Sequence, residues 1–529
     1  MVVPQYGIKF AVHIITNHFG DRVAKVCECL LRRGPLNRPN IKRYTELTDE
    51  QVKNSLLVLI QQNCVQAFIV EQLGGFGDEP RLNTQYVALF DNILHRVRFA
   101  KFLTIASQEF DKQCVELLQG LLEHGRLTLK QMFERAKSSE KEGTSVVLDS
   151  VRESLSKLAT AHYVERCPAP EPLLMAATEE ETPARKRGSK SSKLVEEPET
   201  IEQRAVAAAA PVETLRFSVI STDSGVHGEN NDNNLTSITV GQKRKHNALE
   251  SDESRTADEL TVLYRANFEE FIRHLRHKAC IETVRARLDD GAATVLGAML
   301  EATRSSEQKV KTRYSVPLSL GSIYEEVIKR EAGRNMTLDH AKASLNQLGY
   351  PPLVKESNGS YSIEFEKIIE LAQNDEMESV VLKKYGRDAY RIFRLLSKAN
   401  CLLETDKISD ITFVEKKDTL KILHKMWKDE YLDMEKLFMS GARQSVFFLW
   451  KVNKTTLSRY VLDEMFHAAL NLSLRLAHEL DQEKELLNLP ADRRTGHLLD
   501  RYNRLKKVRI LLESSQMKLD DAIMLFHYF

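Results

Sequence analysis

The sequence predicts a mainly α-helical protein with small β-hairpins, organised as a series of similar modules with a helical hairpin at the end. Two patterns predict this fold class. Amphipathic helical patterns followed by short β-rich runs recur along the chain, and large apolar residues repeat every seven positions near its end. The composition agrees, because 529 residues with 42% hydrophobic and 29% charged residues are typical of a globular chain of about three to four domains.

The first module is predicted at residues 1–90. Helical patterns cover Tyr6–His18 and Asp21–Arg33, and a Gly-Pro pair ends the second of them. Thr48, followed three residues later by Gln51, forms a capping box at the start of a third helix. Two runs rich in β-branched and aromatic residues then predict a hairpin with strands at Val65–Glu71 and Leu82–Phe90.

The second module is predicted at residues 91–168. It begins with a series of helical patterns, which cover Leu94–Phe110, Lys112–His124, Thr128–Lys137 and Val147–Thr160. A short strand is predicted at Tyr163–Arg166, and Pro168 ends the module.

Residues 169–257 differ in composition and predict a flexible linker. They hold stretches rich in Glu and Pro, in Ala, and in Asn, Asp, Gly and Ser, which cannot build an apolar core. Leu215–Ile220 is a candidate for a lone strand. A patch with Arg185, Lys186 and Arg187 predicts nuclear import, and Lys243–Lys245 is a second such cluster. The alternative is that each cluster is an ordinary solvated run of charge.

The third module is predicted at residues 258–370. Three helical patterns precede a helix capped by Thr337, and they cover Leu260–Arg276, Ile281–Thr303 and Ser322–Arg330. The clearest hairpin of the chain follows, because Asn358-Gly359 lies between two β-rich runs and supplies the positive φ angles of a type I′ turn.

The fourth module is predicted at residues 371–453. Its third helix is Glu415–Trp427, and Leu420, Leu423 and Trp427 are expected to share one face. The strands of its wing are predicted at Tyr431–Leu437 and Ser445–Val452.

Residues 454–529 predict a coiled-coil hairpin. Pro490 divides this part into two helical segments, which favours antiparallel packing of one segment on the other. In the second segment the coiled-coil spacing is kept by Leu498, Leu505, Leu512, Leu519 and Phe526. Homodimerisation through these heptads is the alternative.

Helices closed by a β-hairpin are the winged-helix form of the helix-turn-helix unit, whose third helix and wing are the usual contact surfaces. Four tandem winged-helix modules predict an interaction scaffold, because repeating a module multiplies binding surfaces and not active sites.

The residue patterns argue against catalysis, cofactors, metals and membranes. The seven cysteines are scattered without a Cys-x-x-Cys pair, so neither a disulfide framework nor a zinc site is predicted. Gly74–Gly77 runs into Asp78-Glu79, whose charge would repel a phosphate. The sequence lacks an Asp-x-Asp-x-Asp cluster that could hold magnesium ions. Apolar runs all fall short of the roughly eighteen residues of a membrane helix.

The fourth module carries the candidate DNA-binding residues. Because the net charge is only +1, DNA contact must come from local patches. The third helix of this module can place lysines against DNA phosphates, at Lys416, Lys417, Lys421 and Lys425. Arg443 in the wing is a weaker candidate, and the alternative is a solvated helix face. In the first module, acidic residues at the start of the third helix favour packing on protein.

Five stretches in a fixed order carry a family resemblance, and they are His18–Gly20, Gln51–Asn63, Ala161–Pro168, Tyr264–Phe268 and Tyr385–Leu396. Together they resemble the family of the large winged-helix subunit of RNA polymerase III, which is counted as the third subunit of that enzyme. The resemblance covers nearly the whole chain. It weakens in the linker and in the C-terminal hairpin.

The resemblance implies a non-catalytic, specific subunit of DNA-directed RNA polymerase III, with nucleotide addition in the two largest subunits. It implies a heterotrimer with two other polymerase III-specific subunits, docked on the polymerase III core near the clamp. It also implies recruitment through the initiation factor TFIIIB and contact with promoter DNA, mostly with the backbone. Such a nuclear protein would act in initiation and open-complex stabilisation, for synthesis of tRNA, 5S rRNA and other small RNAs.

Two other functions stay open on the residues alone. A free-standing transcription factor that reads a DNA sequence would need Arg and Asn on the exposed face of a third helix, where this chain offers mainly Lys. A multi-winged-helix scaffold for protein interactions outside polymerase III is the other alternative.

Overall fold

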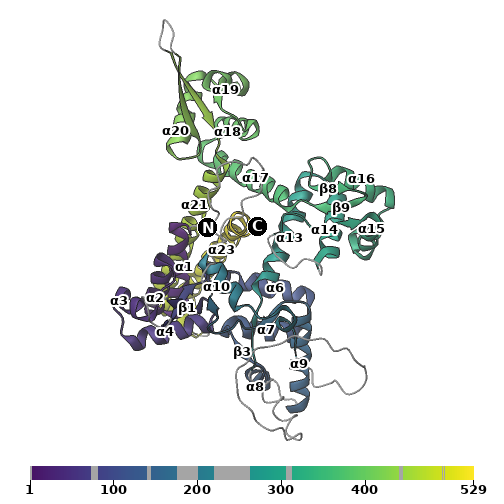
Figure 1. Ribbon diagram of the computed structural model, residues 1–529. Helices are drawn as coiled ribbons and strands as arrows, with labels where there is room; N and C mark the ends of the chain where they lie inside the picture. Colours follow the sequence, from purple (N-terminus) through teal and green to yellow (C-terminus); the bar gives the residue numbers. More distant parts are fainter. Residues whose placement is uncertain are drawn as a thin grey trace. The chain divides into compact units, whose positions relative to one another are not determined.

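A computed structural model describes residues 3–72, 81–139, 144–174, 200–219, 262–304, 312–439, 445–490, 493 and 495–529. Contacts divide the chain into two compact units, which are Ala11–Phe271, and Met1–Phe10 together with Ile272–Phe529. Both units are mainly helical and carry small three-stranded sheets, so the predicted fold class is confirmed (Figure 1).

The first module packs its helices against a two-stranded wing. Its elements are α1 (Gln5–Phe19), α2 (Asp21–Arg33), α3 (Arg38–Thr45), α4 (Asp49–Gln61), β1 (Val65–Gln72) and β2 (Arg81–Ala88). The predicted capping box is confirmed, since the Thr48 hydroxyl accepts a hydrogen bond from the Gln51 amide and the Gln51 side chain accepts one from the Thr48 amide. Val52, Leu56 and Leu59 recur at helical spacing and are buried, which fixes the inner face of α4.

The second module follows directly, with α5 (Phe90–His95), η1 (Arg96–Arg98), α6 (Phe99–Glu109), α7 (Lys112–His124), β3 (Leu127–Thr128), α8 (Leu129–Ser139), α9 (Thr144–Thr160) and β4 (Val164–Arg166). The single helix predicted at Leu94–Phe110 is therefore wrong, because a 3₁₀ turn divides it. Leu118, Leu121, Leu155 and Leu158 are buried and join α7 to α9 in the core of this module.

The sheet of the second module is completed by a strand from far along the chain. β6 (Leu263–Ala266) lies between β3 and β4 and pairs antiparallel with both. The helix predicted at Leu260–Arg276 is therefore wrong over its first residues, and α13 (Phe268–Arg287) starts only after the strand. The physical reason is the alternation within β6, where Tyr264 and Ala266 are buried and Leu263 and Arg265 are not.

Part of the predicted flexible linker is folded. β5 (Leu173–Leu174) pairs parallel with β1, and α10 (Ile201–Ala209) begins at a capping box formed by Thr200 and Gln203. Ala205 lies in one buried cluster with residues of β1, β2 and β5. The lone strand predicted at Leu215–Ile220 is wrong, because α11 (Glu213–Arg216) begins before it. An alanine-rich run has high helix propensity and small side chains, which let α10 pack closely on the sheet.

From Ile272 onward, the third module belongs to the other unit. Its elements are α13, α14 (Asp290–Arg304), β7 (Leu318–Ser319), α15 (Leu320–Lys329), η3 (Glu331–Gly333), α16 (Leu338–Leu348), β8 (Val354–Ser357) and β9 (Ser360–Ile363). The single helix predicted at Ile281–Thr303 is wrong, because Asp289 accepts a hydrogen bond from the Ala292 amide (2.6 Å) and starts a new helix. The predicted turn is confirmed, with positive φ angles at Asn358 and Gly359 between β8 and β9.

The fourth module follows α17 (Phe365–Tyr385) and has α18 (Arg387–Ala399), β10 (Leu403–Glu404), α19 (Thr405–Thr412), α20 (Lys416–Lys428), β11 (Asp433–Met439) and β12 (Ser445–Lys451). Its sheet has the order β10-β12-β11. Trp450 on β12 is fully buried, and its indole N–H donates to the Thr405 hydroxyl at 2.9 Å. This bond ties the wing to the start of α19.

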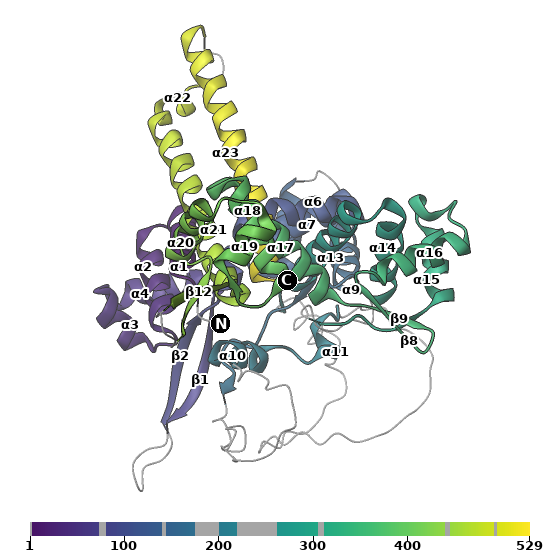
Figure 2. The ribbon, with the colours of Figure 1, turned by 90° about the horizontal axis from the view of Figure 1, so that it is seen from above.

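The C-terminal part is a pair of long helices, α21 (Lys454–Gln482) and α23 (His497–His527), joined through the short α22 (Lys484–Asn488). Figure 2 shows α21 and α23 lying side by side and turning back at α22. The predicted heptad residues of α23 are all buried or half-buried. The start of α1 packs on this hairpin: the Tyr6 ring stacks on His467, with ring centroids 4.1 Å apart, and the Tyr6 amide donates to Asp463 at 2.8 Å.

Candidate nucleic-acid interface

The third helix of the fourth module, α20, presents its lysines to solvent. Thr419, Leu423 and Met426 are buried and form its inner face. Leu420 and Trp427, which were predicted to share one face with Leu423, are 37% and 43% exposed, whereas Leu423 is buried. The buried positions follow a spacing of four and three, which turns the lysines outward.

The four predicted lysines of α20 are all exposed, and their charges are only partly matched. Lys416 lies 3.1 Å from Asp406, and Lys421 lies 3.0 Å from Asp418 three positions earlier on the same helix. Both pairs are open to water, where an ion pair contributes little. Lys417 has no ion pair among the described residues, and the Lys425 amine lies 5.5 Å from the centre of the Tyr385 ring.

The C-terminal end of α20 and its buried side are held by neighbouring elements. Tyr385, at the end of α17, donates a hydrogen bond to Asp429 at 2.6 Å, directly after the helix. Burial, together with this bond, raises the pKa of the Tyr385 phenol well above its ordinary value. His424 packs edge-on against Trp450, with ring centroids 5.2 Å apart. The helix is therefore held at a fixed position against the wing strand β12.

The wing contributes exposed apolar residues besides charge. Leu437 and Phe438 on β11 are 49% and 71% exposed. The Lys436 amine lies 6.0 Å from the centre of the Phe448 ring on the paired strand. Arg443, the predicted wing residue, lies outside the described residues, as do the predicted import residues Arg185, Lys186 and Arg187.

The third helices of the first and third modules carry other surfaces. The exposed side of α4 begins with Asp49 and Glu50 and continues with Leu57 and Val58, which are 56% and 37% exposed. This mixture of acidic and apolar side chains favours a protein partner over DNA. On α16 the basic residue is Lys342, preceded by Asp339. The lysine row is thus particular to α20 among these three helices.

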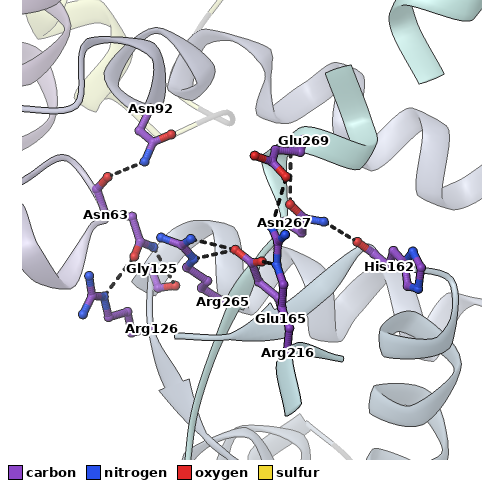
Figure 3. Close-up of polar contacts among 10 residues, drawn as sticks. All are labelled: Asn63, Asn92, Gly125, Arg126, His162, Glu165, Arg216, Arg265, Asn267 and Glu269. Atoms are coloured by element: carbon purple, nitrogen blue, oxygen red, sulfur yellow. Dashed lines mark hydrogen bonds and ion pairs between the residues drawn. The ribbon is translucent and has the colours of Figure 1, made fainter. Parts of the chain in front are cut away.

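A second polar site, which the sequence did not predict, lies in the unit Ala11–Phe271. Glu165 on β4 is 2% exposed, and it binds two arginines (Figure 3). Arg265 on the neighbouring strand β6 reaches one carboxylate oxygen at 2.7 and 2.8 Å, and Arg216 of α11 binds the other oxygen. Arg216 also contacts Glu269 at 3.0 Å. Burial acts to lower the pKa of the Arg216 guanidinium, but the two carboxylates outweigh it and raise that pKa.

Asn267 fixes the turn between β6 and α13. Its side-chain amide donates to the carbonyl of His162 at 2.8 Å, and its side-chain oxygen accepts from the Glu269 amide at 3.2 Å. The stretch Tyr264–Phe268 of the resemblance therefore holds a strand, the arginine that binds Glu165, and this cap. This stretch therefore completes the sheet of the second module and fixes the start of α13.

The first two modules meet at a buried asparagine. Asn63 has a φ of 57° and is 3% exposed. Its side chain donates to the carbonyl of Gly125 at 3.2 Å and accepts from Arg126 at 2.9 Å, while Asn92 donates to its carbonyl at 2.8 Å (Figure 3). Asn tolerates the left-handed conformation better than most residues, which suits this position. The end of the stretch Gln51–Asn63 is thus a joint between modules.

Within the described part of the chain, no group of three or more His, Cys, Asp or Glu side chains is placed to hold a metal ion. Among the same residues, no helix has both the length and the apolar character that crossing a membrane requires.

Three family models match the chain. They are RNA polymerase III subunit RPC82 over residues 153–379, the helix-turn-helix domain of RNA polymerase III subunit RPC82 over residues 9–69, and the C-terminal winged-helix domain of POLR3C over residues 377–452. The chain belongs to the RPC82 family of RNA polymerase III subunits.

Curated relatives agree with membership of the RPC82 family over most of the chain. The DNA-directed RNA polymerase III subunit RPC3 of Bos taurus is 24% identical over 91% of this chain and 86% of its own length. The subunit of the same name from Homo sapiens is 23% identical over the same shares. That of Dictyostelium discoideum is 21% identical over 99% of this chain and all of its own length.

The family matches cover the three sites described above. The winged-helix match at residues 377–452 contains all of α20 and both strands of its wing. The RPC82 match at residues 153–379 contains Glu165 and both of its arginines. The helix-turn-helix match at residues 9–69 contains Asn63.

Proposed function

We propose that this chain is a non-catalytic, specific subunit of DNA-directed RNA polymerase III that acts in promoter recruitment, initiation and open-complex stabilisation. Membership of the RPC82 family and relatives named as polymerase III subunits support this function. As in the expectation from sequence, the chain works in a heterotrimer with two other polymerase III-specific subunits, on the core enzyme near the clamp, and meets TFIIIB and promoter DNA in the nucleus.

We assign the proposed contacts to five folded parts of the chain. The parts are winged helices at 1–90, 91–168, 258–370 and 371–453 and the hairpin at 454–529. The strand β6 also belongs to the second winged helix, because β6 completes the sheet of that module. Multiple winged helices give one subunit several separate contact surfaces, which suits a protein that joins polymerase, initiation factor and DNA.

The DNA contact is proposed for α20, and one observation carries it: Lys417, Lys421 and Lys425 stand one helical turn apart on the exposed face of that helix. Successive lysines are about 6 Å apart along the axis, since an α-helix rises about 1.5 Å per residue. A row of this kind neutralises backbone phosphates and carries little base specificity. Arg443 in the wing would extend the row.

The test is charge reversal in the assembled enzyme, with Lys417→Glu and Lys421→Glu combined. We expect weaker open-complex formation on promoter DNA and a slope of log affinity on log salt that is reduced by about two, because each phosphate contact contributes about 0.9. The matched control combines Lys53→Glu on α4 with Lys342→Glu on α16, which are exposed lysines of other third helices. If the two double variants form open complexes equally well, α20 does not have this role.

The assembly itself is tested by purification of the tagged chain from nuclei at moderate salt. Recovery of the polymerase III core with two smaller specific subunits in equal amounts is expected. Recovery with an unrelated assembly would favour the alternative, an interaction scaffold outside polymerase III. Nuclear import is tested with Arg185→Ala, Lys186→Ala and Arg187→Ala in a fluorescent fusion, which we expect to shift the protein toward the cytoplasm.

A further inference from the structure

The fourth module has a groove that the proposed DNA contact does not use. It lies between α18 and the end of α19 and encloses about 840 Å³. Its walls contain no residue of α20 or of the wing strands. The groove therefore offers a surface separate from the lysine row, and an inference from it does not depend on the DNA proposal.

The rim of the groove carries an unusual phenylalanine. Phe413 follows directly after α19 with a φ of 55°, and its side chain is 92% exposed. Glycine or asparagine is the usual residue in this left-handed position, because a side chain on Cβ strains the backbone there. Neither burial nor backbone preference explains Phe413. Ile411, 47% exposed, and the half-buried Leu395 continue the apolar surface beside it.

The same groove is positively charged. Arg391, Arg394 and Lys398 line it from α18, and none of its lining residues is acidic. Arg391 lies 3.6 Å from Asp388, and Arg394 lies 3.9 Å from Glu378. Both ion pairs are therefore long. Lys398 has no ion pair among the described residues. An apolar surface edged by such cations matches a ligand that is both apolar and acidic.

We propose that this groove binds an acidic segment of a partner protein that carries large apolar side chains. An aromatic or aliphatic side chain of the segment would lie against Phe413, Ile411 and Leu395, and its carboxylates would face the cations of α18. Single-stranded nucleic acid is the less suitable ligand, because base stacking uses a series of exposed aromatic rings. Here Phe413 is the one exposed ring. Tyr390, which also lines the groove, is half-buried, and its hydroxyl accepts a hydrogen bond from Arg394 at 3.2 Å. The larger apolar side chains beside Phe413 are aliphatic, which suits an amphipathic helix in a groove.

The experiment measures peptide binding to the full-length chain by fluorescence anisotropy. The probe is a labelled peptide with Phe and Leu at helical spacing among Glu and Asp. The comparison peptide has Ser in place of Phe and Leu and the same charge, and the third probe is oligo(dT). We expect the apolar acidic peptide to bind about tenfold more tightly than the Ser peptide, because apolar anchors supply most of the affinity of such interfaces.

Three variants assign the binding to the groove. Phe413→Gly should weaken binding of the apolar acidic peptide about tenfold without loss of folding, because glycine fits the left-handed backbone. Arg394→Glu combined with Lys398→Glu should weaken both peptides. Phe438→Ser, which removes another exposed aromatic residue of the same module, should leave binding unchanged.

The opposite results would overturn the proposal. If both acidic peptides bind equally, or if neither binds, the groove does not bind apolar side chains of an acidic segment and the proposal is wrong. Loss of oligo(dT) binding in Phe413→Gly with peptide binding intact would make this a site for single-stranded nucleic acid. Because the variants leave α20 intact, failure here would not affect the test of the lysine row.

Discussion

Replacement of Glu165 by Gln tests whether the buried carboxylate holds the chain around β6 and α11 in place. Glu165 is 2% exposed, and the side chains of its partners Arg265 and Arg216 are 17% and 24% exposed. Glu165→Gln keeps the shape but leaves two guanidinium groups largely buried without their counter-charge. Breaking a buried ion pair from one side costs about 3–5 kcal/mol. We expect about 3 kcal/mol, because Glu269 still faces Arg216.

The loss of stability in Glu165→Gln should be confined to β4, β6 and α11, because β6 and α11 reach β4 from distant parts of the sequence. Hydrogen exchange of the full-length chain, followed peptide by peptide, measures it directly. Protection of the β4 and β6 amides should fall about a hundredfold, because each 1.4 kcal/mol is a factor of ten. The control is Arg285→Ala, which breaks the exposed pair with Asp290 and should cost less than about 1 kcal/mol. Unchanged protection of β4 and β6 in Glu165→Gln would refute the reasoning.

Two further predictions concern the unit Ala11–Phe271 and the third module. Gly125→Ala should lower the free energy of unfolding by at least about 2 kcal/mol, because a Cβ there would lie 2.1 Å from the carbonyl oxygen of Gln61 at a φ of +80°. Gly359→Ala, also at positive φ but in open space, should cost only about 1 kcal/mol, and equal thermal shifts would contradict the steric argument. Burial, and then repulsion by Asp91, raises the pKa of Glu202 on α10 from 4.5 to about 7, so the docking of α10 is strongest below about pH 4.5 and weakens as the pH rises toward 7. Hydrogen exchange of α10 should slow as the pH-corrected measurement moves from pH 8 to 6, and Glu202→Gln should abolish that change; a persistent change would assign it to another group.

The sequence predicted those parts of the fold that depend on local chemistry. Thr48 and Gln51 define a helix start, Asn358-Gly359 defines a turn, and both are found where expected. β6 was missed because a strand of four residues is defined by its partners, and Glu165 and Arg265 pair across 100 positions of sequence. Local patterns do not contain this information.

The candidate surfaces show the same division between local and distant information. The lysine spacing of α20 follows from helix periodicity, so its exposed face could be predicted. Its buried face could not, because whether Leu420 or Met426 points inward depends on where Trp450 and β12 lie. The groove beside Phe413 could not be predicted from the sequence either, because it forms between two helices that share no motif.

The buried polar contacts give a physical reason for motifs that make no contact with a ligand. The joint at Asn63 and the closure at Glu165 both connect segments that are distant in sequence, through hydrogen bonds that few other residue types could make. A buried polar group without its partners is costly, so each network strongly favours one arrangement of its module. In a subunit whose proposed work is to present several surfaces at fixed positions, such joints matter as much as the surfaces. Loss of Glu165 should therefore impair assembly with partners even though its side chain is buried within the second module.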